Sequence, residues 1–225
     1  MSTETARPTL TRERVLAGAI ELADEIGIDA FTIRKLATHL DVKPMTIYHH
    51  VSSKDKILDG MVDIVFDEIE LPTGNDWQRA IRTRCRSARE VLVRHPWAPP
   101  LMESRPEPGP ATLRHHDAVL GCFRRGGFSL ELTAHAYATI DSYVYGFALE
   151  EANLPDGGGA EIAEIAAAIY EESLADYPDL AAFTIDHVLK PGYEFGNSFE
   201  FGLDLIIDGL ARATSDPAFR RIPSS

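Results

Sequence analysis

The sequence predicts an all-α protein made of a small N-terminal head, residues 1–56, and a larger helical body, residues 57–225. Apolar residues recur at three- and four-residue spacing through most of the chain, which is the period of a helix with one buried face. Val, Ile and Thr never alternate with polar residues for long enough to suggest a β-strand. The stretch Pro72–Asp76 interrupts the helices and predicts a connection near residue 73.

The head begins with an amphipathic helix, Thr11–Ile26, which ends at Gly27, a common residue at helix C-termini. Thr32 is a suitable N-cap for the next helix, because its hydroxyl can accept a hydrogen bond from an unpaired backbone N–H. Four apolar residues follow on one face of that helix: Ile33, Leu36, Ala37 and Leu40. We expect the first helix to brace the second.

A tight turn and a very short helix come next in the head. Asp41 tolerates the left-handed backbone of a sharp turn, and Pro44 suits the first position of a helix, where its missing N–H costs nothing. The short helix, Pro44–His50, exposes hydrogen-bonding side chains of the kind that contact phosphates and base edges in a major groove. A longer helix, Ser53–Glu70, follows and would act as a lever between head and body. This pattern is that of a DNA-binding helix-turn-helix.

Helices also account for most of the body. Asp76 predicts the N-cap of a helix over Trp77–Arg94, and the prolines from Pro96 to Pro110 predict a long non-helical connection. Further helices are expected over five ranges: Ala111–Arg125, Leu130–Ala152, Ala160–Ala175, Leu180–Leu189 and Tyr193–Thr214.

Charge is distributed unevenly along the chain, whose formal net charge is −13. Residues 1–56 hold eight basic and eight acidic side chains, and the stretch Phe31–Lys56 holds five basic against two acidic. The rest of the chain holds 14 basic and 27 acidic side chains. Such a dipole would orient the head toward DNA and keep non-specific affinity low. It excludes a general nucleic-acid coat protein, which needs a wide basic surface.

Composition also restricts the compartment. No apolar run approaches 18 residues, so no membrane-spanning helix is predicted. The N-terminus lacks the apolar core of a signal peptide, which predicts a cytoplasmic protein. Cys85 and Cys122 are far apart in the sequence and lack CxxC spacing, so we expect reduced thiols.

Two stretches carry a more specific pattern: FTIRKLATHLDVKPMTIYHHVSSKDKILDGM, Phe31–Met61, and FEFGLDLIIDGL, Phe199–Leu210. With Gly127–Glu131 and Leu149–Glu151, they resemble the tetracycline-repressor-like (TetR-like) transcriptional regulators, in the subgroup that includes the tetracycline repressors. The resemblance implies a helix-turn-helix head and a body that binds a ligand and forms a dimer. The turn departs from the family pattern, because Asp41 stands where Gly is common.

Ten residues of the head are predicted DNA contacts. We expect Tyr48 and Lys54 to bind phosphates, while the resemblance implies a base contact for Arg34. The full predicted set is Thr32, Arg34, Lys43, Pro44, Met45, Thr46, Tyr48, His49, His50 and Lys54. Because one short helix reads only a few base pairs, the expected partner is two-fold-symmetric operator DNA bound by a homodimer.

Two body helices carry apolar stripes that predict the subunit interface. The predicted interface residues are Ile162, Ile165, Ile169, Phe199, Leu203, Ile206 and Leu210. Gly202 and Gly209 would let another helix approach closely, since Gly inside a helix costs about 1 kcal/mol against Ala and suggests a packing reason. The resemblance implies a four-helix bundle made from these two helices of each subunit. The alternative is that both helices pack into the core of their own subunit.

Polar and aromatic residues on otherwise apolar body helices predict a small-molecule site. The candidate ligand-binding residues are Arg84, Trp97, Met102, Arg105, His116, Tyr137 and Asp141. We expect them to line one cavity for a mostly apolar effector with one or two hydrogen-bonding or acidic groups. The alternative is that the aromatic residues are core and that Arg84 belongs to a solvated Arg-rich face.

Metal binding and catalysis have no recognisable pattern here. By resemblance, Arg105 and His116 match residues at the drug pocket of tetracycline repressors, but Leu101 stands where those proteins have a histidine. Neither a tetracycline sensor nor a metal site is therefore expected. The histidines lack HExxH spacing, and no GxSxG motif or phosphate-binding Gly-rich loop occurs.

The sequence therefore predicts a non-enzymatic regulator without a cofactor, a repressor released from a palindromic operator by a small molecule. Two alternatives remain open. One is a DNA-binding regulator or architectural protein without an effector, and the other is a small helical enzyme.

Overall fold

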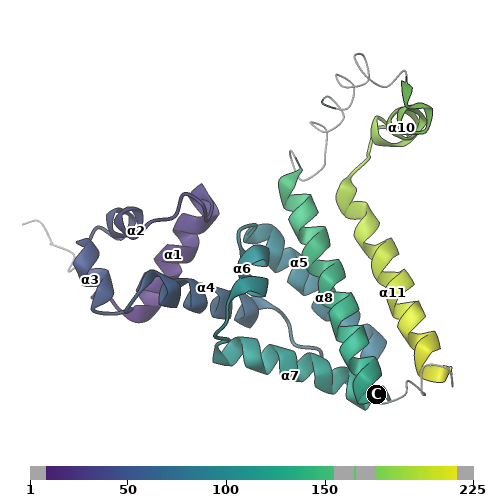
Figure 1. Cartoon of the computed structure of the whole chain (residues 1–225), viewed down its shortest axis with the longest axis horizontal. Coiled ribbons are helices and arrows are strands. Elements are labelled where there is room, and N and C mark those ends of the chain that lie inside the picture. The colour runs from purple at the N-terminus through teal and green to yellow at the C-terminus, as the bar shows by residue number, and fades with distance from the viewer. Residues whose placement is uncertain (1–8, 155–164, 166–175, 217–225) are drawn as a thin grey trace, which may run out of the picture. The chain divides into compact units, whose positions relative to one another are not determined.

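The structure, a computed structural model, describes three parts of the 225-residue chain: residues 9–154, residue 165 and residues 176–216. Within these parts all regular secondary structure is helical (Figure 1), which confirms the predicted all-α class. The chain forms two compact units: the first is Met1–Glu70 with Arg94–Asp117, and the second is Leu71–Val93 with Ala118–Ser225. The predicted boundary after residue 56 divides a DNA-binding region from a ligand-binding and dimerisation region. The compact units do not test this functional division, so it stays a prediction.

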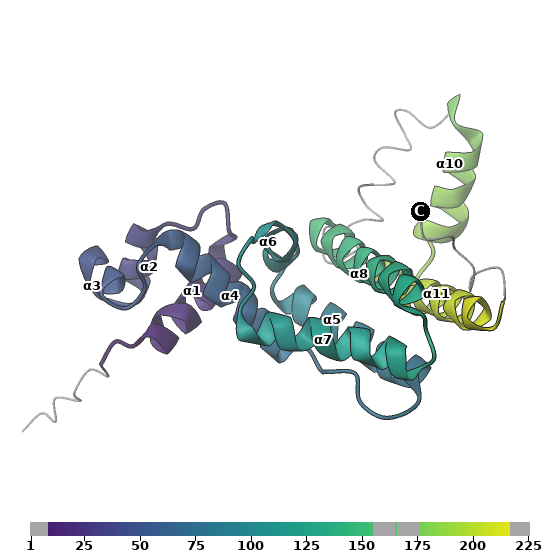
Figure 2. The same cartoon turned by 60° about the horizontal axis from the view of Figure 1, so that its bottom comes forward.

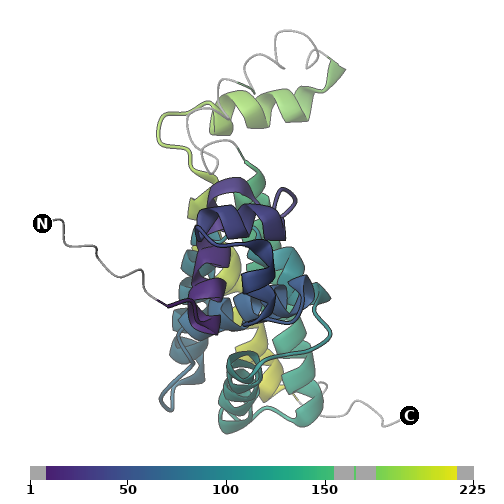
Figure 3. The same cartoon turned by 90° about the vertical axis from the view of Figure 1, so that its left-hand side faces the viewer.

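The first unit contains the N-terminal helices, drawn as purple and blue ribbons in Figure 3. Its elements are α1 (Arg12–Ile26), α2 (Ile33–His39), α3 (Pro44–Tyr48), α4 (Lys54–Glu68), α6 (Ala98–Ser104) and the first turns of α7 (Pro110–Arg125). The hydroxyls of Thr11, Thr32 and Ser53 cap α1, α2 and α4, each accepting a backbone N–H at 3.2 Å. These caps explain why the three helices begin where they do.

The turn between α2 and α3 has the left-handed backbone predicted for it. Asp41 has a φ of 55°, the one positive value at a non-glycine residue in the described parts of the chain. Four fully buried aliphatic side chains, one from each of α1 to α4, form the core that holds the turn in place: Val15, Leu36, Ile47 and Ile57. The helix-turn-helix is thus a packed unit and not a pair of isolated helices.

The second unit holds the longer helices. Its elements are α5 (Trp77–Arg94), the rest of α7, α8 (Leu130–Asn153), α10 (Pro178–Phe183), the π-helical turn η3 (Thr184–Val188), the 3-10 turn η4 (Phe195–Asn197) and α11 (Ser198–Ser215). Helices α8 and α11 lie side by side in Figures 1 and 2. The helix predicted over 160–175 lies outside the described residues, except for residue 165.

The Pro-rich connection corrects one prediction. A helix, α6, runs through Ala98–Ser104, where the sequence suggested a non-helical link. Pro99 and Pro100 fall in its first turn, where backbone N–H groups have no partner within the helix, so their missing N–H groups cost nothing there. No helix in the described parts of the chain is both long and apolar enough to cross a membrane.

Candidate functional site

The short helix α3 is the centre of the candidate DNA-binding surface. Ile47 is fully buried and anchors the helix, while Met45 and Tyr48 are 67% and 39% exposed. The other predicted contacts on this segment are exposed or half-exposed: Lys43, Pro44, Thr46, His49 and His50. One buried anchor under a row of exposed polar and aromatic side chains is the arrangement that a groove-reading helix needs.

The remaining predicted contacts lie at the starts of the neighbouring helices. Thr32 and Arg34 are exposed at the beginning of α2. Lys54, exposed in the first turn of α4, donates one hydrogen bond from Nζ to the backbone oxygen of Phe31 at 3.1 Å. An ammonium group has three donors, so this bond holds the side chain in place and leaves two for a phosphate.

The predicted ligand-binding residues divide between the two units. Trp97, Met102, Arg105 and His116 belong to the first unit, and Arg84, Tyr137 and Asp141 belong to the second. Within the first unit the predicted residues contact α1 and α4. Trp97 donates from Nε1 to Asp24 on α1 at 2.6 Å, and the ring of His116 packs edge-on against Phe66 on α4 at 5.3 Å.

A ladder of carboxylates on α4 binds the segment that contains Arg105. Four aspartates recur at four-residue spacing along this helix: Asp55, Asp59, Asp63 and Asp67. Arg105 pairs with the first two at 3.2 and 2.7 Å, and Arg114 pairs with the fourth. Thr112 donates to the third from its backbone N–H and its hydroxyl, at 2.8 and 3.0 Å. The guanidinium of Arg105, expected to bind a ligand, is therefore matched by this chain's own carboxylates.

The other three predicted ligand residues come together in the second unit. Arg84 on α5 is fully buried and lies 2.7 Å from Asp141 on α8, whose side chain is only 8% exposed. Arg84 also donates from Nη2 to the hydroxyl of Tyr145 at 3.1 Å. Burial, reinforced by the nearby Asp141, raises the pKa of Tyr137, which keeps this phenol protonated. We call Arg84, Tyr137, Asp141 and Tyr145 the buried polar cluster. It places a buried charged pair beside two phenols within the second unit, a combination that ligand sites often contain.

The exposed side of α5 carries a second set of arginines. Arg86 forms a two-bond pair with Glu200 on α11 at 2.7 and 2.6 Å, and Arg89 forms another with Glu151 on α8 at 2.9 and 2.6 Å. Arg82 pairs with Asp204 at 2.9 Å. The alternative interpretation of the Arg-rich run as a solvated face thus fits Arg86, whose side chain is 50% exposed, and not Arg84. The side chains of Arg82 and Arg89 are intermediate, at 24% and 25% exposed.

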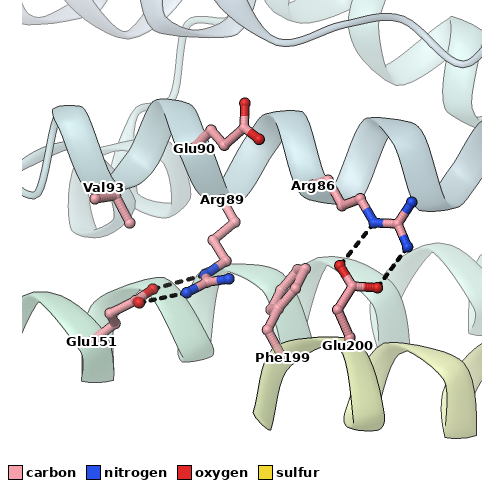
Figure 4. A pocket seen from close by; sticks show the side chains of 7 residues that line it. All are labelled: Arg86, Arg89, Glu90, Val93, Glu151, Phe199 and Glu200. Atoms are coloured by element: carbon pink, nitrogen blue, oxygen red, sulfur yellow. Dashed lines mark hydrogen bonds and ion pairs between the residues drawn. The ribbon is translucent and has the colours of Figure 1, made fainter. Parts of the chain in front are cut away.

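A surface pocket of about 390 Å³ opens between these ion pairs. Figure 4 shows the aromatic ring of Phe199 between the Arg86–Glu200 pair and the Arg89–Glu151 pair. The remaining lining residues are Glu90 and Val93. The pocket is polar at its edges, and its arginines are already paired, so it offers a ligand fewer unused donors than its composition suggests.

Most of the predicted interface residues of α11 are buried within their own chain. Phe199 and Leu203 are fully buried and Leu210 is 9% exposed, while Ile206 is half-buried. For Phe199, Leu203 and Leu210 this burial favours the alternative of packing into their own subunit, because a buried side chain has little area left for a partner. The predicted subunit interface stays a prediction. Ile165 is 42% exposed. Ile162 and Ile169 lie outside the described residues.

Several contact residues escaped the sequence interpretation. Asp24 and His95 are hydrogen-bond partners, and His115, next to the predicted His116, is fully buried. The four-residue spacing of the α4 aspartates was the available signal for the ladder. No cluster of His, Cys, Asp and Glu suited to a metal ion occurs among the described residues.

An exposed recognition helix on a packed three-helix head, followed by a helical body with a buried polar cluster, defines a helix-turn-helix regulator of transcription. Comparison with known proteins gives the family. Residues 71–214 match the family "Tetracyclin repressor-like, C-terminal domain", and residues 15–61 match "Bacterial regulatory proteins, tetR family". The chain belongs to the TetR family of transcriptional regulators, which are DNA-binding proteins and not enzymes.

Individual relatives agree with this assignment. The chain is 32% identical to an HTH-type transcriptional regulator of Saccharopolyspora erythraea, over 91% of this chain and 86% of that protein. It is 32% identical to the HTH-type transcriptional repressor DrrR1 of Streptomyces coeruleorubidus, over 91% and 78%. Among solved structures it is similar to ActR of Streptomyces coelicolor in complex with actinorhodin, with a TM-score of 0.75 and 26% identity over 93% of this chain and all of that one.

Proposed function

We propose that this protein represses transcription as a homodimer on two-fold-symmetric operator DNA, and that a small-molecule effector releases it. Residues 1–56 would bind the DNA, and residues 57–225 would bind the effector and form the dimer. The observation that carries the proposal is α3 with its two flanking residues: Lys43, Tyr48 and His49 are exposed, while Ile47 anchors the helix in the core. The similarity to a named repressor, DrrR1, supports repression as the outcome of binding.

Each exposed side chain of the head has a role that its chemistry suggests. Tyr48 and Lys54 would bind phosphates, and Lys43 and Thr46 would lie nearer the bases, as would Arg34. The other predicted contacts, Thr32, Pro44, Met45, His49 and His50, would complete the surface that follows the groove.

The experiment selects an operator from random duplex DNA with the purified protein and then titrates variants by gel shift at several salt concentrations. Lys54→Ala should weaken binding to all sequences alike and reduce the salt slope by about one, since one phosphate contact is lost. Lys43→Ala should relax preference at particular operator positions. Lys56→Ala is the matched control, because Lys56 is paired with Asp59 and Glu107. Unchanged affinity in a Tyr48→Ala, Lys54→Ala double variant would contradict the proposal.

The dimer would use the exposed faces of α8 and α11. Phe201 and Leu205 on α11 are 70% and 57% exposed, and Leu149 on α8 is 40% exposed. A Cβ added at Gly146 of α8 or Gly209 of α11 would meet nothing within 4 Å in this chain, so both positions leave room for another helix. Large apolar side chains on two adjacent helices favour a covering partner, and a second copy supplies matching faces.

A charge placed on this face tests the dimer. Leu205→Glu should sediment as a monomer and lose operator binding, because an unpaired buried charge would cost several kcal/mol in the interface. Val93→Glu is a control with a similarly exposed apolar residue on α5, 50% exposed in the chain. A wild-type protein that is monomeric at micromolar concentration would rule the dimer out.

The effector would contact the buried polar cluster. Its buried charged pair suits a mostly apolar ligand whose hydrogen-bonding or acidic group reorganises the Arg84–Asp141 contact. ActR, similar in fold and 26% identical, has been solved with actinorhodin, which supports a response to a small molecule. Ligand binding and operator binding must weaken each other by the same factor, because the coupling free energy is reciprocal.

A thermal-shift panel of aromatic antibiotics and acidic metabolites tests the effector site, since a ligand that binds only the folded state raises the melting temperature. Tyr137→Phe should abolish the response to any hit and leave operator affinity unchanged. The matched control is Tyr143→Phe, because the Tyr143 hydroxyl donates to the backbone oxygen of Phe199 at 2.8 Å and lies outside the cluster. Equal responses in both variants would place the ligand elsewhere.

A further inference from the structure

The last turns of α1 and α4 hold the segment that follows α5 by hydrogen bonds. Oδ1 of Asp24 accepts from Nε1 of Trp97 at 2.6 Å and lies 2.8 Å from Nδ1 of His95. Oε2 of Glu68 lies 3.4 Å from the other ring nitrogen of His95 and accepts from Arg94 at 2.6 Å. We call Asp24, Glu68, His95 and Trp97 the clasp. Its members belong to the first unit.

The chemistry of the clasp makes Asp24 hard to replace. Trp97 is 4% exposed and its indole N–H can only donate, so it needs an acceptor from the protein. His95 is 7% exposed and directs one ring nitrogen at the same oxygen of Asp24. One carboxylate oxygen therefore contacts two buried aromatic rings, which belong to residues separated by a single position in the sequence.

The clasp joins the two regions that the family comparison separates. Asp24 lies in the matched N-terminal region, residues 15–61, while His95 and Trp97 lie in the matched C-terminal region, residues 71–214. The covalent connection between these regions runs through α4. The clasp is a second connection between the two regions, made by side chains. It lies at the C-terminal end of α1, away from the N-cap.

Helix α1 packs closely against the C-terminal end of α2 and against α4. A Cβ at Gly18 would lie 2.6 Å from a methyl group of Leu40, and Glu21 lies 3.1 Å from Nε2 of His39. On α4, a Cβ at Gly60 would lie 2.8 Å from Leu16. Close backbone approach of this kind leaves little freedom for α1 to move alone. Helix α2 leads directly through the turn to the recognition helix.

We propose that Asp24 is a positioning residue for DNA binding, which fixes α1, and with it the recognition helix, against the segment that follows α5. Asp24 touches no DNA in this role. The inference rests on the proposed function, because head position matters only when two heads must match two half-sites of one operator.

The test measures operator affinity as a function of half-site spacing. The selected operator is compared with versions whose centre is one or two base pairs longer or shorter. Asp24→Ala and Trp97→Phe should broaden or shift the preferred spacing and lower affinity for the selected operator about tenfold, the scale of one hydrogen bond to a charged group. Asp24→Asn should have a smaller effect, since its amide oxygen still accepts from Trp97. The salt slope should stay that of the wild type, because no phosphate contact is removed.

The control is Glu25→Gln, at an exposed neighbour on α1 that lies outside the clasp. It should keep the wild-type spacing profile. A merely structural Asp24 would lower the melting temperature and leave the spacing profile of the folded protein unchanged, and that result would overturn the inference. If Asp24→Ala does not fold, Trp97→Phe decides in its place. Failure of the wild type to select any duplex would overturn the proposed function, and the inference with it.

Discussion

Two arginines on α5, separated by one residue, lie in opposite environments. The Arg84 side chain is 0% exposed and its partner Asp141 is 8% exposed, at 2.7 Å. The Arg86 side chain is 50% exposed and its partner Glu200 is 46% exposed, at 2.6 Å. The two distances are nearly equal, so pair geometry alone does not separate them. What separates them is the face of the helix on which each arginine lies, and hence the solvent that surrounds its charge.

The difference in burial gives the two pairs different roles in stability. Removing one partner of a buried pair leaves an uncompensated charge in the interior, whereas water screens an exposed charge that loses its partner. Arg89 is intermediate, with its side chain 25% exposed and that of Glu151 12% exposed. The Arg89 guanidinium also lies over the rings of Phe199 and Phe147, at 5.0 and 5.4 Å. One helix thus presents the same chemistry at three levels of burial.

The buried pair should give the largest effect. Asp141→Ala should lower the free energy of unfolding by about 3–5 kcal/mol, because Arg84 stays charged without its partner. Urea denaturation of the full chain measures this loss. The double variant Arg84→Met, Asp141→Leu should recover most of it, since no buried charge remains. A double variant as unstable as Asp141→Ala would show that packing, and not the unpaired charge, causes the loss.

The half-buried pair should give an intermediate effect. Arg89→Ala should lower the free energy of unfolding by about 1–2 kcal/mol, from the lost charged hydrogen bonds and the lost contact with two aromatic rings. Arg89→Lys is the informative control, because it keeps the charge but not the planar fork that binds both oxygens of Glu151. Full stability in the Lys variant would mean that charge alone matters at this site.

The helices around these pairs could be predicted from the sequence because their causes are local. The apolar spacing and N-cap of α2 lie within a few residues of each other, and so do Asp76 and the start of α5, where Oδ1 of Asp76 accepts from the Arg79 N–H at 3.1 Å. The left-handed Asp41 was predictable for the same reason. Helix α6 was missed because Pro99 and Pro100 are read as helix breakers unless the start of the helix is known.

The contacts of the candidate sites could not be predicted, since they join distant parts of the chain. Arg105 donates a hydrogen bond to Asp59, which is separated from it by 46 residues in the sequence. Trp97 donates one to Asp24 over a separation of 73 residues. The spacing of residues on one helix does not reveal which other helix will face them. The predicted ligand set therefore mixed residues of two units, although Arg84, Tyr137 and Asp141 do belong to one unit.

Apolar stripes are ambiguous for a different reason. Phe199 and Leu203 have the spacing of an interface and of a core alike, and they are buried within their own chain. Phe201 and Leu205, two further apolar residues of the same helix, are the exposed ones. The periodicity of α11 predicts two apolar faces but cannot say which of them a second subunit would cover.

The exposed pair should give the smallest effect, and it sharpens the comparison by its response to salt and pH. Arg86→Ala should lower the free energy of unfolding by about 0–1 kcal/mol, and added salt should reduce even that, because both side chains are well exposed.

Hydrogen bonds from Arg86 lower the pKa of Glu200 below its usual 4.5. Because the folded state lowers this pKa, the contribution of Glu200 to stability is present above pH 4.5 and is lost as the pH falls through the lowered value. The difference between wild type and Arg86→Ala should therefore shrink in acid, as urea denaturation across this range would show. A loss as large as that of Asp141→Ala, unaffected by salt, would contradict the claim that burial decides what an arginine pair contributes.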